Sequence, residues 1–214
     1  MNLKRREFSF GATAIVFASS TIFSNGTTAQ TVKPVAGKDY YVLTQPAPVD
    51  APTGSVEVAE FFSYMCSVCN AFEPTFNAWA KSPPKGVVVR RVPVPFLANF
   101  ESMQRLYFAL EAMHLVDKLH GAVFAAIHIE RRKLSDAATI ADWVASKGVD
   151  RSSFLAQFNS FTVATKATRA GQLTNIYAID GVPKLGVAGR FLTEGSAKGL
   201  RVVESLVGDL KAGR

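Results

Sequence analysis

Residues 60–74 read Glu60-Phe61-Phe62-Ser63-Tyr64-Met65-Cys66-Ser67-Val68-Cys69-Asn70-Ala71-Phe72-Glu73-Pro74 and contain both cysteines of the 214-residue chain. An apolar run precedes the pair, and the residues after it have helical spacing, so Cys66 is expected at the start of a helix. Unpaired backbone N–H groups at a helix N-terminus stabilise a thiolate and make the corresponding disulfide easier to reduce. The pair therefore indicates thiol–disulfide chemistry.

Outside this stretch the apolar residues change their period along the chain. Residues 56–62 form a nearly continuous apolar run, which predicts a buried strand, whereas apolar residues three and four apart predict helices without strands from about residue 99 to 161. Helices that return a parallel strand beside its neighbour, followed by a hairpin, predict a mixed α/β sheet covered on both faces. The expected elements in order are an edge strand at 40–44, a strand at 56–62, a helix at 66–80, a strand at 87–96, the helical segment at 99–161, a helix at 162–179, a hairpin of 184–187 with 190–193, and a last helix around 200–210.

The first 29 residues have the pattern of a secretory leader. Residues 4–6 are basic, and the apolar stretch at 10–23 is too short to cross a bilayer. Small residues favour cleavage near Ala29, so we expect export; the alternative is a helix retained in the mature protein. Arg5-Arg6-Glu7-Phe8 partly resembles a twin-arginine signal, which leaves the export route open between the general secretory and the twin-arginine pathways.

The charge of the chain does not indicate a nucleic-acid-binding protein. The leader holds three of the 24 basic residues and one of the 17 acidic ones, so the remainder is only mildly basic. Its longest basic run, residues 131–133, has no interleaved aromatic residues and is interpreted as a solvated helix end.

Three alternatives to a redox role of the cysteine pair are less favoured. Exported thiols rarely stay reduced, which argues against a buried thiol pair. A tetrahedral zinc site needs four ligands; the chain has no second cysteine pair, and its histidines, His114, His120 and His128, stand six and eight residues apart. A structural disulfide would close so short a loop that it would constrain little of the unfolded chain. It remains the alternative in which the chain is a non-catalytic binding domain.

Two segments together resemble the DsbA family of periplasmic disulfide oxidases. Residues 60–74 are similar to the active-site segment of the family, and Gly181-Val182-Pro183 resembles its second signature, a valine followed by a cis-proline that faces the cysteines. The resemblance extends over essentially the whole chain after the leader. It implies a thioredoxin fold with a mixed sheet, formed by residues 30–98 and 162–214 and interrupted by an inserted all-helical domain at 99–161.

This resemblance implies a periplasmic thiol:disulfide oxidoreductase that introduces disulfide bonds into unfolded exported proteins through a reversible Cys66–Cys69 disulfide. The implied partner that reoxidises the pair is a quinone-linked membrane oxidase of the DsbB type, and a monomer is expected. No metal and no cofactor is expected, since the electrons reside in the two sulfurs.

Further residues are expected to serve the reaction. Glu60 ends an apolar run and is either a strand-end carboxylate in water or a partly buried group that relays the proton of the inner cysteine. Arg91 or its neighbour Arg90 is the candidate counter-charge. Val182-Pro183 is either an ordinary turn or a segment whose free Val182 backbone pairs with an extended substrate and whose proline hinders metal capture by the thiols.

The central dipeptide departs from the family pattern. Relatives commonly have Pro-His between the cysteines, whereas this chain has Ser67-Val68. An imidazole there can stabilise the thiolate by charge or hydrogen bonding, and Val68 can do neither. The sequence therefore predicts thiol–disulfide exchange but leaves the direction of electron flow open, and a reductase or isomerase of the same fold stays an alternative.

Overall fold

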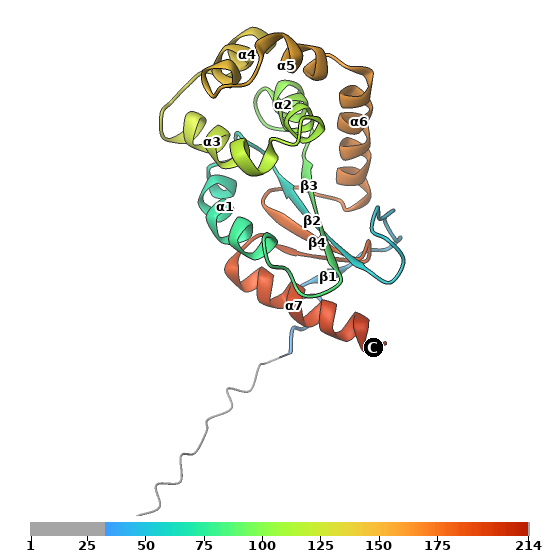
Figure 1. Cartoon of the computed structure of the whole chain (residues 1–214). Helices are drawn as coiled ribbons and strands as arrows, with labels where there is room; N and C mark the ends of the chain where they lie inside the picture. Colours follow the sequence, from blue (N-terminus) through green and yellow to red (C-terminus); the bar gives the residue numbers. More distant parts are fainter. Residues whose placement is uncertain (1–32, 214) are drawn as a thin grey trace, which may run out of the picture. The chain divides into compact units, whose positions relative to one another are not determined.

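A five-stranded mixed sheet organises residues 33–213, the part of the chain that the computed structural model describes (Figure 1). Strand β2 pairs in parallel with β3 and antiparallel with β4, and the other neighbouring strands are antiparallel. Along the sheet the strands are ordered β1 (Tyr41–Val42), β5 (Phe191–Glu194), β4 (Lys184–Val187), β2 (Val56–Phe62) and β3 (Val87–Pro93).

One face of the sheet packs against the two helices that follow β2 and β5, namely α1 (Ser67–Ala80) and α7 (Ala197–Lys211) (Figure 1). Successive side chains of a strand point to opposite faces, so Val56 and Val58 share this layer with apolar residues of both helices. Glu60 follows in the same alternation and therefore points toward α1.

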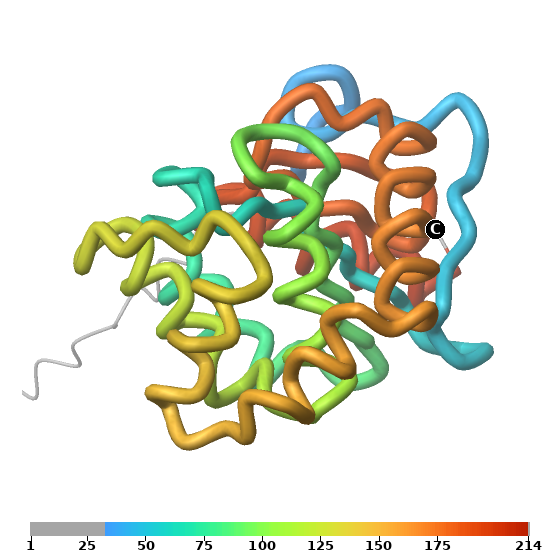
Figure 2. Tube along the Cα trace, turned by 90° about the horizontal axis from the view of Figure 1, so that it is seen from above, coloured from blue at the N-terminus to red at the C-terminus, as the bar shows by residue number. Residues whose placement is uncertain are grey.

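The opposite face packs against the helical part of the chain between β3 and β4. Phe61 meets the ring of Tyr177 at 4.8 Å, directly after α6 (Phe161–Ile176). Helix α2 (Phe100–Ala112) packs against α6 and β3, and α3 (Val116–His128) packs against α1 (Figure 2). The remaining helices of this part are α4 (Ala137–Ser146) and α5 (Arg151–Phe158).

The predicted order of strands and helices within residues 33–213 is confirmed, and the differences lie at element ends. Only Tyr41 and Val42 pair with β5, so the edge strand is shorter than the predicted 40–44. Strand β3 ends at Pro93 rather than at residue 96, because its partner β2 ends at Phe62, whose carbonyl accepts the last hydrogen bond from the N–H of Val94 at 2.9 Å. Within this part of the chain, no helix is both long and apolar enough to cross a membrane.

Two predictions are not tested by the described residues. The leader over residues 1–29 lies outside them, and the division of the chain at residues 98 and 161 stays a prediction.

Candidate redox site

The two cysteines lie one turn apart at the start of α1. Cys66 is the N-cap residue, and its sulfur accepts a hydrogen bond from the backbone N–H of Cys69 at 3.2 Å. Cys66 is partly exposed, whereas Cys69 is 1% exposed; both are free thiols. Burial raises the pKa of the Cys69 thiol well above its ordinary range, and the neighbouring Cys66 raises it further. Cys66 is therefore the sulfur that another protein can reach.

The loop before β4 lies against the sulfur of Cys66. The thiol of Cys66 donates to the carbonyl oxygen of Val182 at 3.4 Å, and the Val182–Pro183 peptide bond is cis. The carbonyl of Pro183 in turn accepts a hydrogen bond from the backbone N–H of Gly195 at 3.0 Å. A Cβ at residue 195 would stand 2.7 Å from the carbonyl carbon of Pro183, so only glycine fits this close approach.

A groove of about 570 Å³ adjoins this loop. Val68 lines it and is 59% exposed, so an apolar side chain between the cysteines faces whatever approaches Cys66. The other lining residues come from the proline loop and from the turn before α7: Asp180, Gly181, Val182, Pro183, Lys184, Glu194, Gly195 and Ser196.

Glu60 is buried beneath this surface and paired with Arg91. The two residues are register partners in β2 and β3, and Arg91 Nε lies 3.2 Å from Glu60 Oε2. Glu60 is 1% exposed, so the alternative of a strand-end carboxylate in water is wrong. Burial raises the pKa of Glu60 to about 8; Arg91 opposes this rise and Glu73 adds to it. Arg90 points to the other face, where it pairs with Asp50 at 3.1 Å.

Three residues that our sequence analysis did not assign complete the buried side of the site. Arg91 Nη2 donates to Glu73 Oε1 at 3.2 Å, and Glu73 Oε2 lies 3.3 Å from Nε2 of His120. The other ring nitrogen, Nδ1, is 2.7 Å from the hydroxyl of Tyr64. Glu73 follows Cys69 by four residues, so helical periodicity could have placed it on the same face. No local pattern links His120 to the cysteines, because it lies in α3.

These buried groups do not suit a divalent cation. Single ligand atoms of Glu60, Glu73 and His120 lie within 4.8 Å of one another. However, the guanidinium of Arg91 contacts both carboxylates at 3.2 Å. A second cation at this point would meet the fixed positive charge of Arg91, so the arrangement favours holding a proton.

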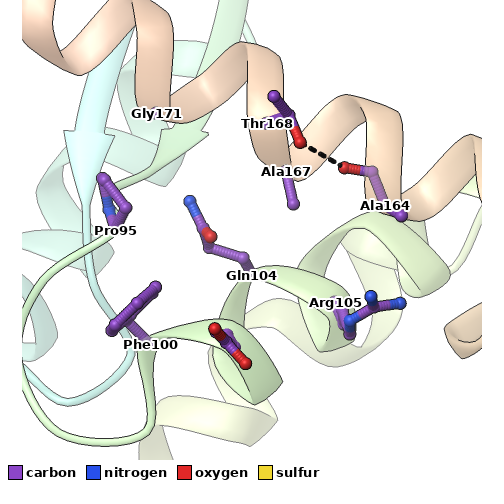
Figure 3. Close-up of a pocket in the computed structure, with 9 residues that line it drawn as sticks. Pro95, Phe100, Gln104, Arg105, Ala164, Ala167, Thr168 and Gly171 are labelled. Carbon is purple, nitrogen blue, oxygen red and sulfur yellow. Dashed lines mark hydrogen bonds between the residues drawn. The ribbon is translucent and has the colours of Figure 1, made fainter.

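A second cavity, of about 330 Å³, lies between α2 and α6 (Figure 3). Gln104 points into it from α2 and donates from its amide to the carbonyl of Pro93 at 2.8 Å. None of the five residues that we predicted from the sequence as site residues lines this cavity. It is therefore separate from the groups gathered around the cysteines.

Comparison with known proteins agrees with this geometry. Residues 57–205 match the family model of the DSBA-like thioredoxin domain. The thiol:disulfide interchange protein DsbA of Bordetella parapertussis is 40% identical over 200 residues, covering 91% of this chain and 92% of that protein. The protein of the same name from Pseudomonas aeruginosa is 38% identical over 185 residues, with 86% of each chain covered.

Solved structures agree as well. The crystal structure of Pseudomonas aeruginosa DsbA superposes with a TM-score of 0.79 and 34% identity, over 84% of this chain and 96% of that one. The oxidoreductase DsbA from Xylella fastidiosa superposes with a TM-score of 0.78 and 28% identity, over 84% and 98% of the two chains. The fold is thus the thioredoxin fold with the helical insertion that the sequence predicts.

Proposed function

Because this chain belongs to the DsbA family of thiol:disulfide oxidoreductases, we propose that it is exported to the periplasm and introduces disulfide bonds into unfolded proteins there. The proposal rests on the difference in exposure between the two cysteines. Cys66 caps α1 at the surface beside the carbonyl of Val182, while Cys69 is buried. Such a pair can exchange with an outside thiol through one sulfur and retain the other as an internal leaving group.

The reaction begins when a substrate thiolate attacks the sulfur of Cys66 in the Cys66–Cys69 disulfide. That disulfide breaks, a mixed disulfide forms between the substrate and Cys66, and Cys69 leaves as a thiolate. Burial disfavours the thiolate, so Cys69 takes up a proton, for which the carboxyl group of Glu60 is the nearby source. A second substrate thiolate attacks the substrate sulfur and releases Cys66, so the substrate is oxidised by two electrons and the pair is reduced.

The loop before β4 holds the substrate during this exchange. An extended chain running past Cys66 can hydrogen-bond to the backbone of Val182, as in other cases of strand addition to a protein edge. Pro183 and Gly195 keep that backbone against the sulfur. We assign Val182, Pro183 and Gly195 to the active site, together with Cys66, Cys69 and Glu60.

Reoxidation completes the cycle and needs an electron acceptor. A quinone-linked membrane oxidase of the DsbB type fits this role, because such a protein would reach the partly exposed Cys66 in the same way as a substrate. The chain is proposed to act as a monomer, with the segment 99–161 inserted as a helical domain into the thioredoxin-like part.

One observation favours a reductase or isomerase as the second candidate. Val68 is exposed beside Cys66 and offers neither a charge nor a hydrogen-bond donor to the thiolate. A thiolate with less stabilisation makes the disulfide less oxidising.

A redox titration against glutathione tests these possibilities. The thiol and disulfide forms are quantified over a series of reduced-to-oxidised glutathione ratios, with Cys66→Ser as the variant that cannot exchange. A disulfide that oxidises glutathione supports the proposed oxidase, and one more reducing than glutathione supports the second candidate. Resistance to reduction at every ratio would instead support a structural disulfide and contradict both enzymatic proposals.

A further inference from the structure

Two buried carboxylates share one guanidinium beneath the cysteine pair. Glu60 and Glu73 each lie 3.2 Å from Arg91, and all three side chains are almost fully buried. One positive charge cannot neutralise two carboxylates in a site of low dielectric, and a net buried charge is costly. One of the two carboxyl groups must therefore hold a proton near neutral pH, as in other pairs of close carboxylates.

The surroundings of Glu60 and Glu73 are unequal. Among the described residues, Glu60 has Arg91 as its charged partner, through Nε. Glu73 has Arg91 at Oε1 and the imidazole of His120 at Oε2, 3.3 Å away. Oε2 of Glu60, Oε2 of Glu73 and Nε2 of His120 all lack an aligned hydrogen-bond partner in the part of the chain that the structure describes, and Nε2 of His120 lies 3.3 Å from Oε2 of Glu73.

The contact with Tyr64 determines which ring nitrogen of His120 carries the proton. Burial keeps the pKa of His120 below its ordinary value, so the ring is neutral and has one N–H group. If the N–H were at Nδ1, the lone pair of Nε2 would face the carboxylate of Glu73. If the hydroxyl of Tyr64 donates to Nδ1, at 2.7 Å, Nε2 carries the hydrogen and places this positive end of the N–H dipole 3.3 Å from Oε2 of Glu73.

We propose that His120 is a positioning residue of the redox site: its Nε2–H stabilises the ionised form of Glu73 and so assigns the shared proton to Glu60. The consequence is that the proton is held at the carboxyl group whose charge acts on Cys69. This inference rests on the proposed function, because the location of the proton matters to catalysis only if Cys69 leaves as a thiolate.

Other groups around Glu60 do not supply this asymmetry. The strand β4 presents Leu185 as its register partner, which carries no charge. Tyr64 and Tyr107 interact with Glu60, but burial raises both phenol pKa values, so both hydroxyl groups stay neutral. The titratable or charged groups that face Glu60 are therefore Arg91 from β3, Cys69 and Glu73 from α1, Tyr107 from α2, His120 from α3, and Tyr64 from the loop before α1.

Infrared titration of the carboxyl groups tests the proposal directly. The band of a protonated carboxylic acid is followed against pH in the dithiol and disulfide forms of the protein, and its owner is identified by the shift of its frequency in Glu60→Asp or in Glu73→Asp, each of which keeps both carboxyl groups. His120→Leu removes the N–H, and His120→Gln, as the matched control, keeps an amide N–H in a similar place.

In the wild type and in His120→Gln, the acid band is expected to belong to Glu60. In His120→Leu, the midpoint of Glu60 protonation is expected to fall by about one pH unit, a tenfold change in its proton affinity, while Glu73 gains a protonated fraction. The same midpoint in all three proteins, or an acid band owned by Glu73 in the wild type, would overturn the proposal.

A measurement on the wild type covers the case in which His120→Leu does not fold. The nitrogen chemical shifts of the His120 ring, assigned by their absence in His120→Gln, should be those of the neutral tautomer protonated at Nε2. A ring protonated at Nδ1 would contradict the proposal. None of these readouts depends on activity, whereas the proposed function is tested by the exchange with glutathione, so the two can fail separately.

Discussion

Replacement of Glu60 by glutamine should make the protein more stable at neutral pH, although it removes an ion pair. The carboxyl group of Glu60 is 1% exposed and shares the positive charge of Arg91 with Glu73. Glutamine has nearly the same volume, can still accept from Arg91, and carries no charge. Arg91 is then left with one carboxylate, which gives a balanced buried pair.

The magnitude follows from proton binding. Burial raises the pKa of Glu60 from 4.5 to about 8 in the folded protein, so the folded state binds this proton more tightly than the unfolded chain. The stabilisation that this proton provides is complete below pH 4.5 and is lost as the pH rises toward 8. At pH 7 folding must take up a proton at a cost of about 3 kcal/mol, at roughly 1.4 kcal/mol per pH unit above 4.5. Glu60→Gln avoids this cost.

Urea denaturation of the dithiol form between pH 4.5 and 8, followed by tryptophan fluorescence, measures the effect. The difference in unfolding free energy between Glu60→Gln and the wild type should be small at pH 4.5 and should grow to about 3 kcal/mol at pH 7. Glu101→Gln, at an exposed position of α2, is the control for the loss of a carboxyl group that is not buried. If the profiles of Glu60→Gln and the wild type run parallel, Glu60 does not take up a proton on folding.

Three other outcomes follow from the site. With limiting alkylating reagent, Cys66 of the reduced protein should be labelled before the buried Cys69. Peptide mapping measures the order of labelling, and the opposite order would contradict our assignment of Cys66 as the attacked sulfur. Gly195→Ala should displace Pro183 and slow exchange with thiol peptides, at a stability cost of about 1–3 kcal/mol, whereas Gly208→Ala in α7, with open space around its Cβ, should exchange as the wild type does. Val68→His should make the disulfide more oxidising, because an imidazole favours the thiolate. The reduction potential is measured against glutathione, where each 30 mV corresponds to about 1.4 kcal/mol. An unchanged potential would mean that the helix start, and not the residue at position 68, sets the reduction potential of the disulfide.

Local patterns predicted the parts of this protein that depend on neighbours in sequence. The apolar run of β2 and the helix that starts at the cysteines were found because their signals repeat within a few residues. The sequence left Arg91 and Arg90 as candidate counter-charges of Glu60, and the strand register in the structure decides for Arg91. Whether Glu60 was buried could not be decided, since that depends on how α1 and α3 close over the strand.

The position of His120 illustrates what the sequence could not provide. It lies in α3, 51 positions after Cys69. Its contact with Glu73 depends on the packing of α3 against α1. Considered by spacing alone, the histidines were only weak candidates for metal binding. A side chain whose role comes from tertiary packing leaves no periodic signal, so only the structure identifies it.

The packing of α3 on α1 also limits how this protein can be divided or recombined. A shortened chain without the helices α2–α5 would keep both cysteines and the proline loop, but Tyr64 and Glu73 would lose their partner in α3. The charges under the cysteine pair would then be open to solvent. The helical segment is therefore not an independent module added beside an unchanged redox centre. A substitution on α1 or α3 that alters their interface therefore requires a compatible side chain on the other helix. A chimera between relatives has to take both α1 and α3 from the same parent.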